Sequence, residues 1–293
     1  MSGTVFGFIG VGDMGGPMAL RLFERGIRLV VFDVDEATRQ RFAELGVGVA
    51  GSVHDLASRC DVVLACLPTP KICLSVARQV AAAPDRRAVI HVEMSTVGVD
   101  AIREIGTVLD EGGVTLIDSP ISGGPRAVPV GKLTCFASGP SNAVERVRPA
   151  YAALSDRFFH LGEEIGLAQA MKVGNNLLAA ANLAVTSEVV RMLERAGIAP
   201  ATAIEIINVS TGRNRASEEL FPKQVLTGAY SQGAKLGILA KDTQLAIEAA
   251  SRYRAGFPLG TAIGAVWTAA VDDGFGQGDI TRIYDWTAHR NGE

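Results

Sequence analysis

A lysine and an asparagine in the second half of the chain have the types and spacing needed for acid–base chemistry. Lys172 and Asn176 are four residues apart in a helical pattern, so their side chains share one face. The neighbouring positions are small or apolar, which predicts that Lys172 is partly buried. Burial lowers the pKa of a lysine and allows it to exchange protons near neutral pH. The alternative is a solvated lysine beside a surface asparagine.

A glycine-rich loop near the N-terminus has the pattern G-x-G-x-x-G at residues 10–15, directly after a strand pattern and at the start of a helix pattern. The first glycine allows a tight turn, the second lets the backbone approach a pyrophosphate, and the third lets helix and strand pack closely. The helix N-terminus offers N–H groups and a positive dipole end to phosphates. The alternative is an ordinary glycine-rich turn. The residues predicted to hold a dinucleotide here are Gly10, Val11, Gly12, Asp13 and Met14.

Asp33 ends the second strand pattern, about twenty residues after the loop, where an acid can bind both ribose hydroxyls. Its carboxylate would repel a 2′-phosphate, and the next residues, Val34 and Asp35, include no arginine to neutralise one. The sequence therefore favours NAD over NADP. The alternative reading of Asp33 is a turn or helix-capping acid.

Three further segments are candidates for the same site. Leu67 and Pro68 follow a buried strand pattern, and Thr96 follows the next one, at the edge where doubly wound sheets bind ligands. Consecutive N–H groups at 122–124 could form a nest for a carboxylate, with the Ser122 hydroxyl as a further donor. Plain loops and a turn containing a serine are the alternatives.

The first half of the chain alternates short apolar runs with helical patterns. The continuous runs at 62–67 and 88–92 are typical of parallel strands covered on both faces. We expect an α/β fold in which a Rossmann-type, doubly wound parallel sheet carries right-handed crossovers. The strands are expected at 5–9, 29–32, 62–67, 88–92, 114–117 and 133–137, with the last two extending the sheet.

The pattern changes near residue 162. Residues 165–195 form one long helical pattern without proline, which we expect to cross the domain junction. Almost no strand pattern follows residue 160, so the second domain is predicted to be all-α, and the domains are predicted at 1–162 and 163–293. Further helices are expected at 201–207, 236–254, 258–272 and 279–286.

Composition excludes several classes of protein. The formal net charge of −3 argues against nucleic acid and anionic membrane partners, and 48% hydrophobic residues argue against disorder. The four cysteines form no C-x-x-C pair, and the N-terminus has no basic signal region, so we expect free thiols and a cytoplasmic protein. No histidine or cysteine cluster has the spacing of metal ligands, and no metal is assigned.

Taken together, four segments resemble the β-hydroxyacid dehydrogenase family, which includes 3-hydroxyisobutyrate dehydrogenase and tartronate semialdehyde reductase. The resemblance covers nearly the whole chain, and the order and spacing of the segments make it specific. The segments are residues 7–19, residues 118–124 running on to 131–133, residues 172–176, and Lys241 with Asp242.

The resemblance implies a Rossmann domain, a helical domain and an active site between them. Lys172 would be the catalytic acid/base, and Asn176 would bind the substrate. Ser122, Gly123 and Gly124 would hold its carboxylate, while Thr96 and Lys241 would lie near the nicotinamide and substrate. The substrate would be a small 3-hydroxy acid, similar to 3-hydroxyisobutyrate, or its semialdehyde. Family members are commonly dimers or tetramers, so a homodimer or homotetramer is expected.

The chain departs from the family pattern at three places. Pro125-Arg126 follows Gly124, Asn214-Arg215 stands where an aromatic is usual, and Lys235 is an unusual charge. We hypothesise that Arg126 or Arg215 widens the preference toward more polar or doubly acidic substrates; a solvated surface arginine is the alternative.

Other functions remain open at the level of sequence. One is a reductase of tartronate semialdehyde or glyoxylate that uses NADPH, and another is an imine reductase, although that group typically lacks the lysine. From a different class, the chain could be a non-catalytic dinucleotide-binding regulator, against which the presence of Lys172 and Asn176 argues.

Overall fold

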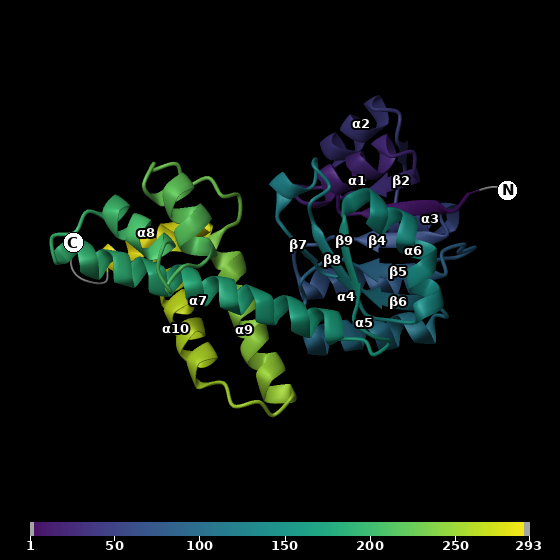
Figure 1. Ribbon diagram of the computed structural model, residues 1–293. Coiled ribbons are helices and arrows are strands. Elements are labelled where there is room, and N and C mark those ends of the chain that lie inside the picture. Colours follow the sequence, from purple (N-terminus) through teal and green to yellow (C-terminus); the bar gives the residue numbers. More distant parts are fainter. Residues whose placement is uncertain (1–2, 290–293) are drawn as a thin grey trace. The chain divides into compact units, whose positions relative to one another are not determined.

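The computed structural model describes residues 3–289. The chain divides into two compact units, Met1–Lys172 and Val173–Glu293, and the division falls inside the helix α7 (Leu167–Arg195) (Figure 1). Residues 165–195 were expected to form one helix, and α7 confirms this. The domain limits of 1–162 and 163–293 stay a prediction, because a division inside a continuous helix does not say which residues fold together.

A parallel sheet of six strands organises the first unit. Its strand order, β3-β2-β1-β4-β5-β6, is that of a doubly wound Rossmann sheet. From β1 the order runs outward to β3 on one side, and β4 to β6 follow on the other side, so the order switches between β1 and β4 while all strands stay parallel. The predicted fold class is confirmed. The strands are β1 (Val5–Ile9), β2 (Arg28–Phe32), β3 (Gly48–Val49), β4 (Val62–Ala65), β5 (Ile90–Glu93) and β6 (Thr115–Asp118).

Both faces of this sheet are buried. In β1, Phe6 and Phe8 belong to one apolar cluster, and Val5 and Ile9 belong to another, because successive side chains point to opposite faces. Gly7 completes the second face, where a Cβ would lie 2.4 Å from Leu56 Cδ2. The helices contributing to the first cluster are α1 (Gly15–Glu24), α2 (Glu36–Glu44) and α6 (Ser141–Leu154). Those contributing to the second are α3 (Val53–Arg59), α4 (Pro70–Ala81) and α5 (Val99–Glu111).

Side-chain caps fix where three of these helices begin. Asp35, Ser52 and Thr69 each accept a hydrogen bond from the N–H three residues later, at the starts of α2, α3 and α4. Such caps satisfy N–H groups that the helix itself leaves without partners. Asp35 and Thr69 stand a few residues after the ends of β2 and β4, close in the chain to the predicted ligand-binding residues.

The predicted strand at 133–137 forms, but its expected place in the main sheet is wrong. It is β8 (Thr134–Ala137), the middle of a separate sheet, antiparallel to β7 (Ile121–Ser122) and parallel to β9 (Arg157–His160). β8 meets the end of β6 at an antiparallel bridge between Asp118 and Ser138. Residues 119–133 return the chain antiparallel to the end of β6 without the crossover that a parallel strand requires, so β8 does not continue the parallel ladder.

The second unit is helical, as predicted. Among the described residues after β9, no strand forms apart from an isolated bridge between Lys235 and Asp279. The core surrounds Trp267, which is fully buried. The elements after α7 are α8 (Pro200–Asn208), a π-helix (Ala216–Val225), α9 (Leu236–Arg252), α10 (Pro258–Asp272) and α11 (Ile283–His289). Short 3-10 helices are Pro125–Ala127, Phe275–Gln277 and Ile280–Arg282.

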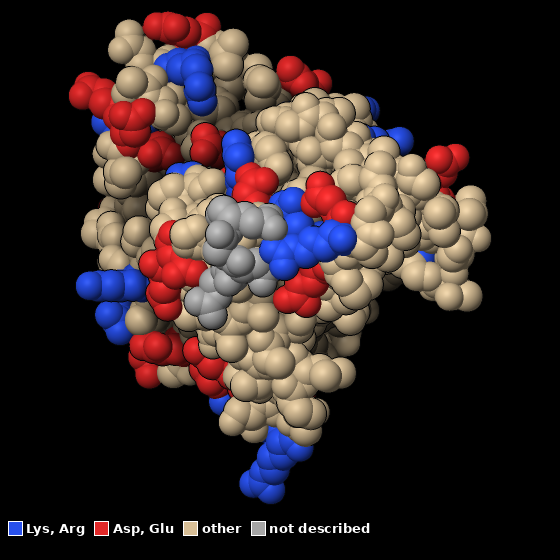
Figure 2. Space-filling view, turned by 90° about the vertical axis from the view of Figure 1, so that its left-hand side faces the viewer, with Lys and Arg blue, Asp and Glu red and all other residues tan. Residues whose placement is uncertain are grey.

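The surface carries mixed charge. On the face shown in Figure 2, basic and acidic side chains lie next to one another. Ion pairs in the second unit include Arg191–Glu194 and Arg282–Asp285. All four cysteines are free, as expected. In the part of the chain that the structure describes, no helix has the length and apolar character needed to cross a membrane.

Candidate active site

The glycines of the glycine loop differ in whether the fold itself requires them. Gly10 has φ +84°, and a Cβ there would lie 2.3 Å from the Cys66 carbonyl oxygen. A Cβ on Gly15 would lie 1.8 Å from the Gly10 carbonyl oxygen, so both positions are restricted by the fold itself. At Gly12 a Cβ would meet no atom within 4 Å, so the fold does not require glycine there. The open space at Gly12 fits a ligand that approaches the backbone, as a pyrophosphate does.

The start of α1 lies directly after the glycine loop and adds to the same candidate phosphate site. Met14 caps the helix without a side-chain hydrogen bond, and no acidic residue stands in the first turn. The positive end of the helix dipole therefore faces the loop with no carboxylate of the first turn to offset it. These features match a dinucleotide phosphate.

Asp33 holds the glycine loop from the end of β2. Its Oδ2 accepts the Val11 N–H at 2.8 Å, and its Oδ1 accepts the Asp35 N–H at 3.0 Å. Each carboxylate oxygen keeps a further lone pair for a ribose hydroxyl. The helix-capping acid is Asp35, so the capping alternative for Asp33 is wrong. Sequence analysis overlooked Arg39, whose guanidinium donates to the Asp33 carbonyl oxygen at 2.7 Å.

Two of the loops at the carboxyl end of the sheet are joined directly. The Leu67 N–H donates to the Ser95 hydroxyl at 2.8 Å, so the segment with Leu67 and Pro68 is tied to the one with Thr96. The Ser95 N–H in turn donates to Glu93 Oε1 at 3.0 Å. The structure therefore brings these predicted site residues together on neighbouring strands β4 and β5.

Lys172 is buried, with 8% of its surface exposed. The expectation of partial burial is confirmed, and the alternative of a solvated lysine is wrong. The helical segment around it is continuous, and Asn176 follows one turn later on the same helix. The polar residues Gln169, Lys172 and Asn176 thus form one line along α7.

In the second unit, Asp242 organises the other predicted residues. Its Oδ2 accepts the Asn176 Nδ2 at 2.6 Å, and its Oδ1 lies 2.9 Å from Lys241 Nζ. Asp242 is 3% exposed, and the hydrogen bond from Asn176 and the ion pair with Lys241 stabilise its buried carboxylate. Sequence analysis quoted Asp242 as part of a motif and missed this role. The useful signal was an acid directly after Lys241 in an otherwise apolar helical pattern.

Ser122, Gly123 and Gly124 lie at the beginning of the small sheet. Ser122 pairs with Thr134 across β7 and β8, and the two glycines have positive φ values of 134° and 69°. A Cβ on Gly124 would meet no atom within 4 Å, whereas one on Gly123 would lie 3.1 Å from Leu133 Cδ2. Gly124 thus leaves space for a ligand, and the role of this loop in binding a carboxylate stays a prediction.

A buried network that sequence analysis did not identify surrounds Asp118. Its carboxylate accepts hydrogen bonds from Gly166 N, Gln169 N, Gln169 Nε2 and the Ser138 hydroxyl. Burial raises the pKa of Asp118 to about 6, and the hydrogen bonds from Gln169 and Ser138 oppose this rise. Asp118 belongs to a motif that the sequence singled out, but only the fold brings the start of α7 to it.

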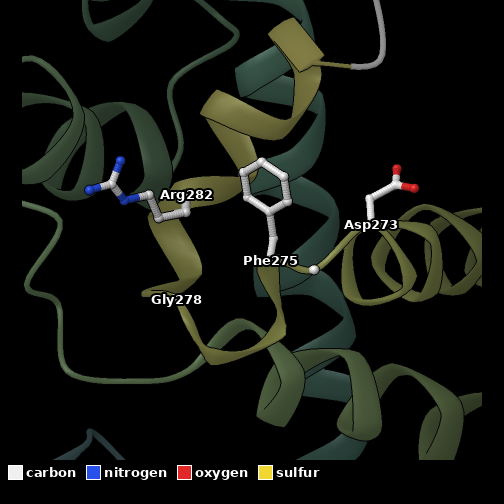
Figure 3. A pocket seen from close by; sticks show the side chains of 5 residues that line it. Asp273, Phe275, Gly278 and Arg282 are labelled. Carbon is white, nitrogen blue, oxygen red and sulfur yellow. The ribbon is translucent and has the colours of Figure 1, made fainter.

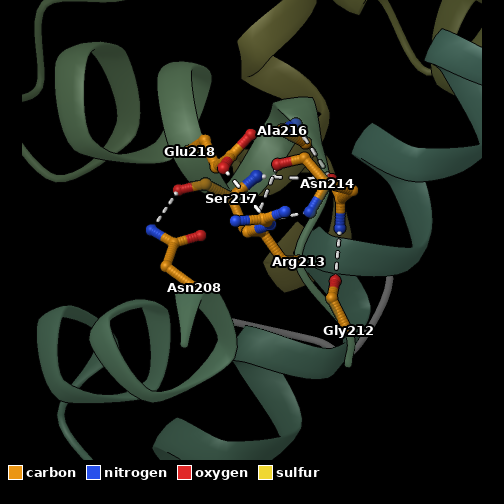
Figure 4. Close-up of polar contacts among 7 residues, drawn as sticks. All are labelled: Asn208, Gly212, Arg213, Asn214, Ala216, Ser217 and Glu218. Atoms are coloured by element: carbon orange, nitrogen blue, oxygen red, sulfur yellow. Dashed lines mark hydrogen bonds and ion pairs between the residues drawn. The ribbon is translucent and has the colours of Figure 1, made fainter. Parts of the chain in front are cut away.

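The departure at Asn214 has a structural explanation (Figure 4). Asn214 Oδ1 accepts the N–H groups of Ala216 at 2.9 Å and Ser217 at 3.3 Å, at the start of the π-helix. Arg215 is paired with Glu219 at 3.1 Å, with a side chain 61% exposed. Arg126 is also exposed, and Lys235 Nζ donates to Gln277 Oε1. For Arg215 these contacts favour the surface-arginine alternative.

The second unit also contains a cavity of about 310 Å³ (Figure 3). It is lined by Asp273, Gly274, Phe275, Gly278 and Arg282. None of these is a predicted site residue. Within residues 3–289, no group of three or more potential ligands could hold a metal ion.

Comparison with known proteins matches both parts of the chain. Residues 5–162 match the NAD binding domain of 6-phosphogluconate dehydrogenase, and residues 166–287 match the NAD-binding domain of NADP-dependent 3-hydroxyisobutyrate dehydrogenase. The chain belongs to the β-hydroxyacid dehydrogenase family. The predicted resemblance is confirmed, and with it the assignment as an NAD(P)-dependent oxidoreductase.

Relatives within this family span the whole length of the chain. NAD-dependent L-serine dehydrogenase of Pseudomonas aeruginosa is 30% identical, over 96% of this chain and 97% of its own. The 2-(hydroxymethyl)glutarate dehydrogenase of Eubacterium barkeri is 29% identical, over 94% and 92%. The structure of Mycobacterium tuberculosis 3-hydroxyisobutyrate dehydrogenase with L-serine has a TM-score of 0.89 at 25% identity, covering 97% of this chain and 99% of that one. These β-hydroxyacid dehydrogenases are enzymes, so the alternative of a non-catalytic regulator loses its support.

Proposed function

We propose that this dehydrogenase oxidises a small 3-hydroxy acid, or reduces its semialdehyde, with Lys172 as the general acid/base. The observation that carries this proposal is the burial of Lys172, with 8% exposed, one turn before Asn176 on a continuous helix. Burial penalises the charged form of an amine, and this is the environment in which lysines act as general acids and bases. The named substrates of the relatives, which include 3-hydroxyisobutyrate and serine, are consistent with it.

In the direction of oxidation, Lys172 accepts the proton of the substrate hydroxyl, and the carbon that bears this hydroxyl becomes a carbonyl carbon. The bound nicotinamide supplies the acceptor for the hydride that this carbon loses. In the direction of reduction, Lys172 returns the proton to the oxygen. Asn176, fixed by Asp242, orients the substrate through the remaining positions of its amide, and the N–H groups of 122–124 hold the carboxylate.

The glycine loop and Asp33 would hold the cofactor, with Leu67, Pro68, Thr96 and Lys241 as further contacts. We propose NAD as the preferred form, because the Asp33 carboxylate would repel a 2′-phosphate. NADP is the second candidate, and one observation favours it: the Arg39 guanidinium lies at the Asp33 carbonyl, 2.7 Å from its oxygen. A reductase using NADPH would be the corresponding alternative activity.

The test is a screen for absorbance changes of NAD(H) and NADP(H) with 3-hydroxyisobutyrate, L-serine, glycerate, threonate, 4-hydroxybutyrate and their aldehydes. Lys172→Ala should lose at least ~10²-fold in kcat while it still binds NADH. A Lys172→Ala protein with unchanged kcat would refute the assignment of the acid/base. Arg126→Ala and Arg215→Ala should leave the order of substrates unchanged if these arginines are surface residues.

We further propose a homodimer or homotetramer and a cytoplasmic location. The proposed oligomer is supported by the dimers and tetramers that are common in the family. The proposed location is supported by the four free cysteines. Sedimentation of the purified protein would measure the number of subunits.

A further inference from the structure

The side chain of Gln169 uses every hydrogen-bonding position of its amide. Its Oε1 accepts the N–H groups of Val97 and Gly98, both at 3.0 Å. Its Nε2 donates to the Ser95 carbonyl oxygen and to Asp118 Oδ1, also at 3.0 Å each. Gln169 is fully buried, and an amide has two donors and two acceptor positions, so no capacity remains.

The chemistry of these partners allows one orientation of the amide. The two N–H groups of Val97 and Gly98 require the oxygen of Gln169, and the Ser95 carbonyl requires its nitrogen. Asp118 presents an acceptor to the same nitrogen, and its other oxygen accepts Gly166 N and Gln169 N at the start of α7. A buried network that is completely satisfied favours a single arrangement, because any rotation leaves buried polar groups without partners.

The network joins three segments that carry predicted site residues or neighbour them. The segment Ser95 to Gly98 contains Thr96, and the Ser95 hydroxyl accepts the N–H of Leu67. The third segment is the start of α7, where Gln169 lies in the first turn and Lys172 follows three residues later on the same face. All these contacts lie within the first compact unit.

We propose that Gln169 is a positioning residue that, together with Asp118, holds the Thr96 segment against the first turn of α7 and so sets where Lys172 stands relative to the cofactor-binding loops. This rests on the proposed role of Lys172. Displacing an acid/base by about 1 Å can cost ~10²-fold in rate, so a fixed network of this kind has a kinetic consequence.

Exchanging the donor and acceptor roles of Gln169 and Asp118 tests the proposal. In Gln169→Glu, the new carboxylate faces the carboxylate of Asp118. In Asp118→Asn, the amide nitrogen of the new asparagine faces the amide nitrogen of Gln169, and neither can accept. In the double variant, the new asparagine donates to the new glutamate, and only the Ser95 carbonyl loses its donor.

Gln169→Met, which keeps the length and adds no buried charge, serves where a single variant does not fold. The matched control is Gln224→Met, since Gln224 is also buried and its Oε1 accepts the Ser231 N–H at 2.8 Å.

Two measurements separate positioning from general stability. The first is hydrogen exchange of the Val97 and Gly98 amides, which needs no turnover and should accelerate at least ~10-fold in Gln169→Met, because methionine removes the oxygen that accepts both N–H groups. The second is steady-state kinetics with 3-hydroxyisobutyrate or L-serine, whichever the wild type oxidises faster. We expect kcat to fall ~10²-fold, with a larger isotope effect for substrate deuterated at the reacting carbon.

The double variant should recover at least ~10-fold in kcat over the worse single variant, and Gln224→Met should resemble the wild type in both measurements. Single variants, or Gln169→Met, with wild-type kcat would overturn the proposal, as would a double variant no better than the worse single one. The proposed function has its own test: if Lys172→Ala keeps full activity, the acid/base assignment fails, whereas exchange at Val97 and Gly98 still reports whether Gln169 anchors the segment.

Discussion

Replacing Gly10 and Gly12 separately by alanine should distinguish a glycine that the fold needs from one that the ligand needs. At Gly10 the new Cβ would lie 2.3 Å from the Cys66 carbonyl oxygen, and φ is +84°. The backbone conformation alone costs alanine about 1–2 kcal/mol, and relief of the clash adds a similar amount. We expect Gly10→Ala to lose about 3 kcal/mol of stability, or roughly 6–12 °C in Tm for a unit of this size.

At Gly12 the same methyl group meets no atom within 4 Å. Stability should therefore stay unchanged or rise by about 0.4–1 kcal/mol, because alanine reduces the entropy of the unfolded chain. A bound pyrophosphate would, however, be displaced by about the radius of a methyl group. Loss of its hydrogen bonds to the loop should cost about 2–3 kcal/mol, which is roughly 30–150-fold in the Kd for NADH.

The assay pairs thermal unfolding with fluorescence titration of NADH for the wild type and both variants. The reasoning predicts opposite profiles: Gly10→Ala unfolds early, and Gly12→Ala folds normally but binds NADH weakly. Wild-type affinity in Gly12→Ala would refute the placement of the pyrophosphate. An equal loss of Tm in both variants would show that the open space at Gly12 is not available to a side chain.

Three further predictions concern charged groups. Because burial raises the pKa of Asp118 from 3.8 to about 6, its protonated form is favoured in the native state, so its contribution to stability is present below pH 3.8 and lost as the pH rises through about 6. The loss amounts to about 3 kcal/mol, and the difference in free energy of unfolding in urea between wild type and Asp118→Asn should change by that amount between about pH 3 and about pH 8; a parallel pH dependence would contradict it. Asp33→Asn keeps an acceptor for the glycine loop and removes the charge, so kcat/KM with NADP relative to NAD should rise at least ~10-fold, and adding Arg39→Ala should reverse part of that gain; an unchanged ratio would exclude Asp33 as the determinant. Asp242→Asn weakens the hydrogen bond to Asn176 from a charged to a neutral one, which should lower kcat/KM for the hydroxyacid about tenfold; an unchanged kcat/KM would contradict the role of Asp242.

Local patterns in the sequence were sufficient to predict the Rossmann sheet, the glycine loop and the long helix. Continuous apolar runs identify buried parallel strands, and the need for glycine at Gly15 follows from local sterics, because a Cβ there would meet the Gly10 carbonyl oxygen. The burial of Lys172 was also predictable, because its helical neighbours are small or apolar. These features depend on residues close to each other in the chain.

Contacts between distant segments could not be predicted in this way. The place of β8 depends on the reversal of the chain after Asp118, which puts Ser138 opposite it in an antiparallel bridge. Gln169 is 74 residues from Ser95 and 51 from Asp118, and nothing in its local sequence shows that it meets either.

The sequence by itself determined which types of side chain are available for chemistry and which elements bear them, because those properties follow from side-chain type and local periodicity. The tertiary structure alone decided how they are held. Asp242 fixes Asn176 across 66 residues, and Asp33 fixes Val11 across 22, because hydrogen bonds between buried groups form only where folding brings donor and acceptor together.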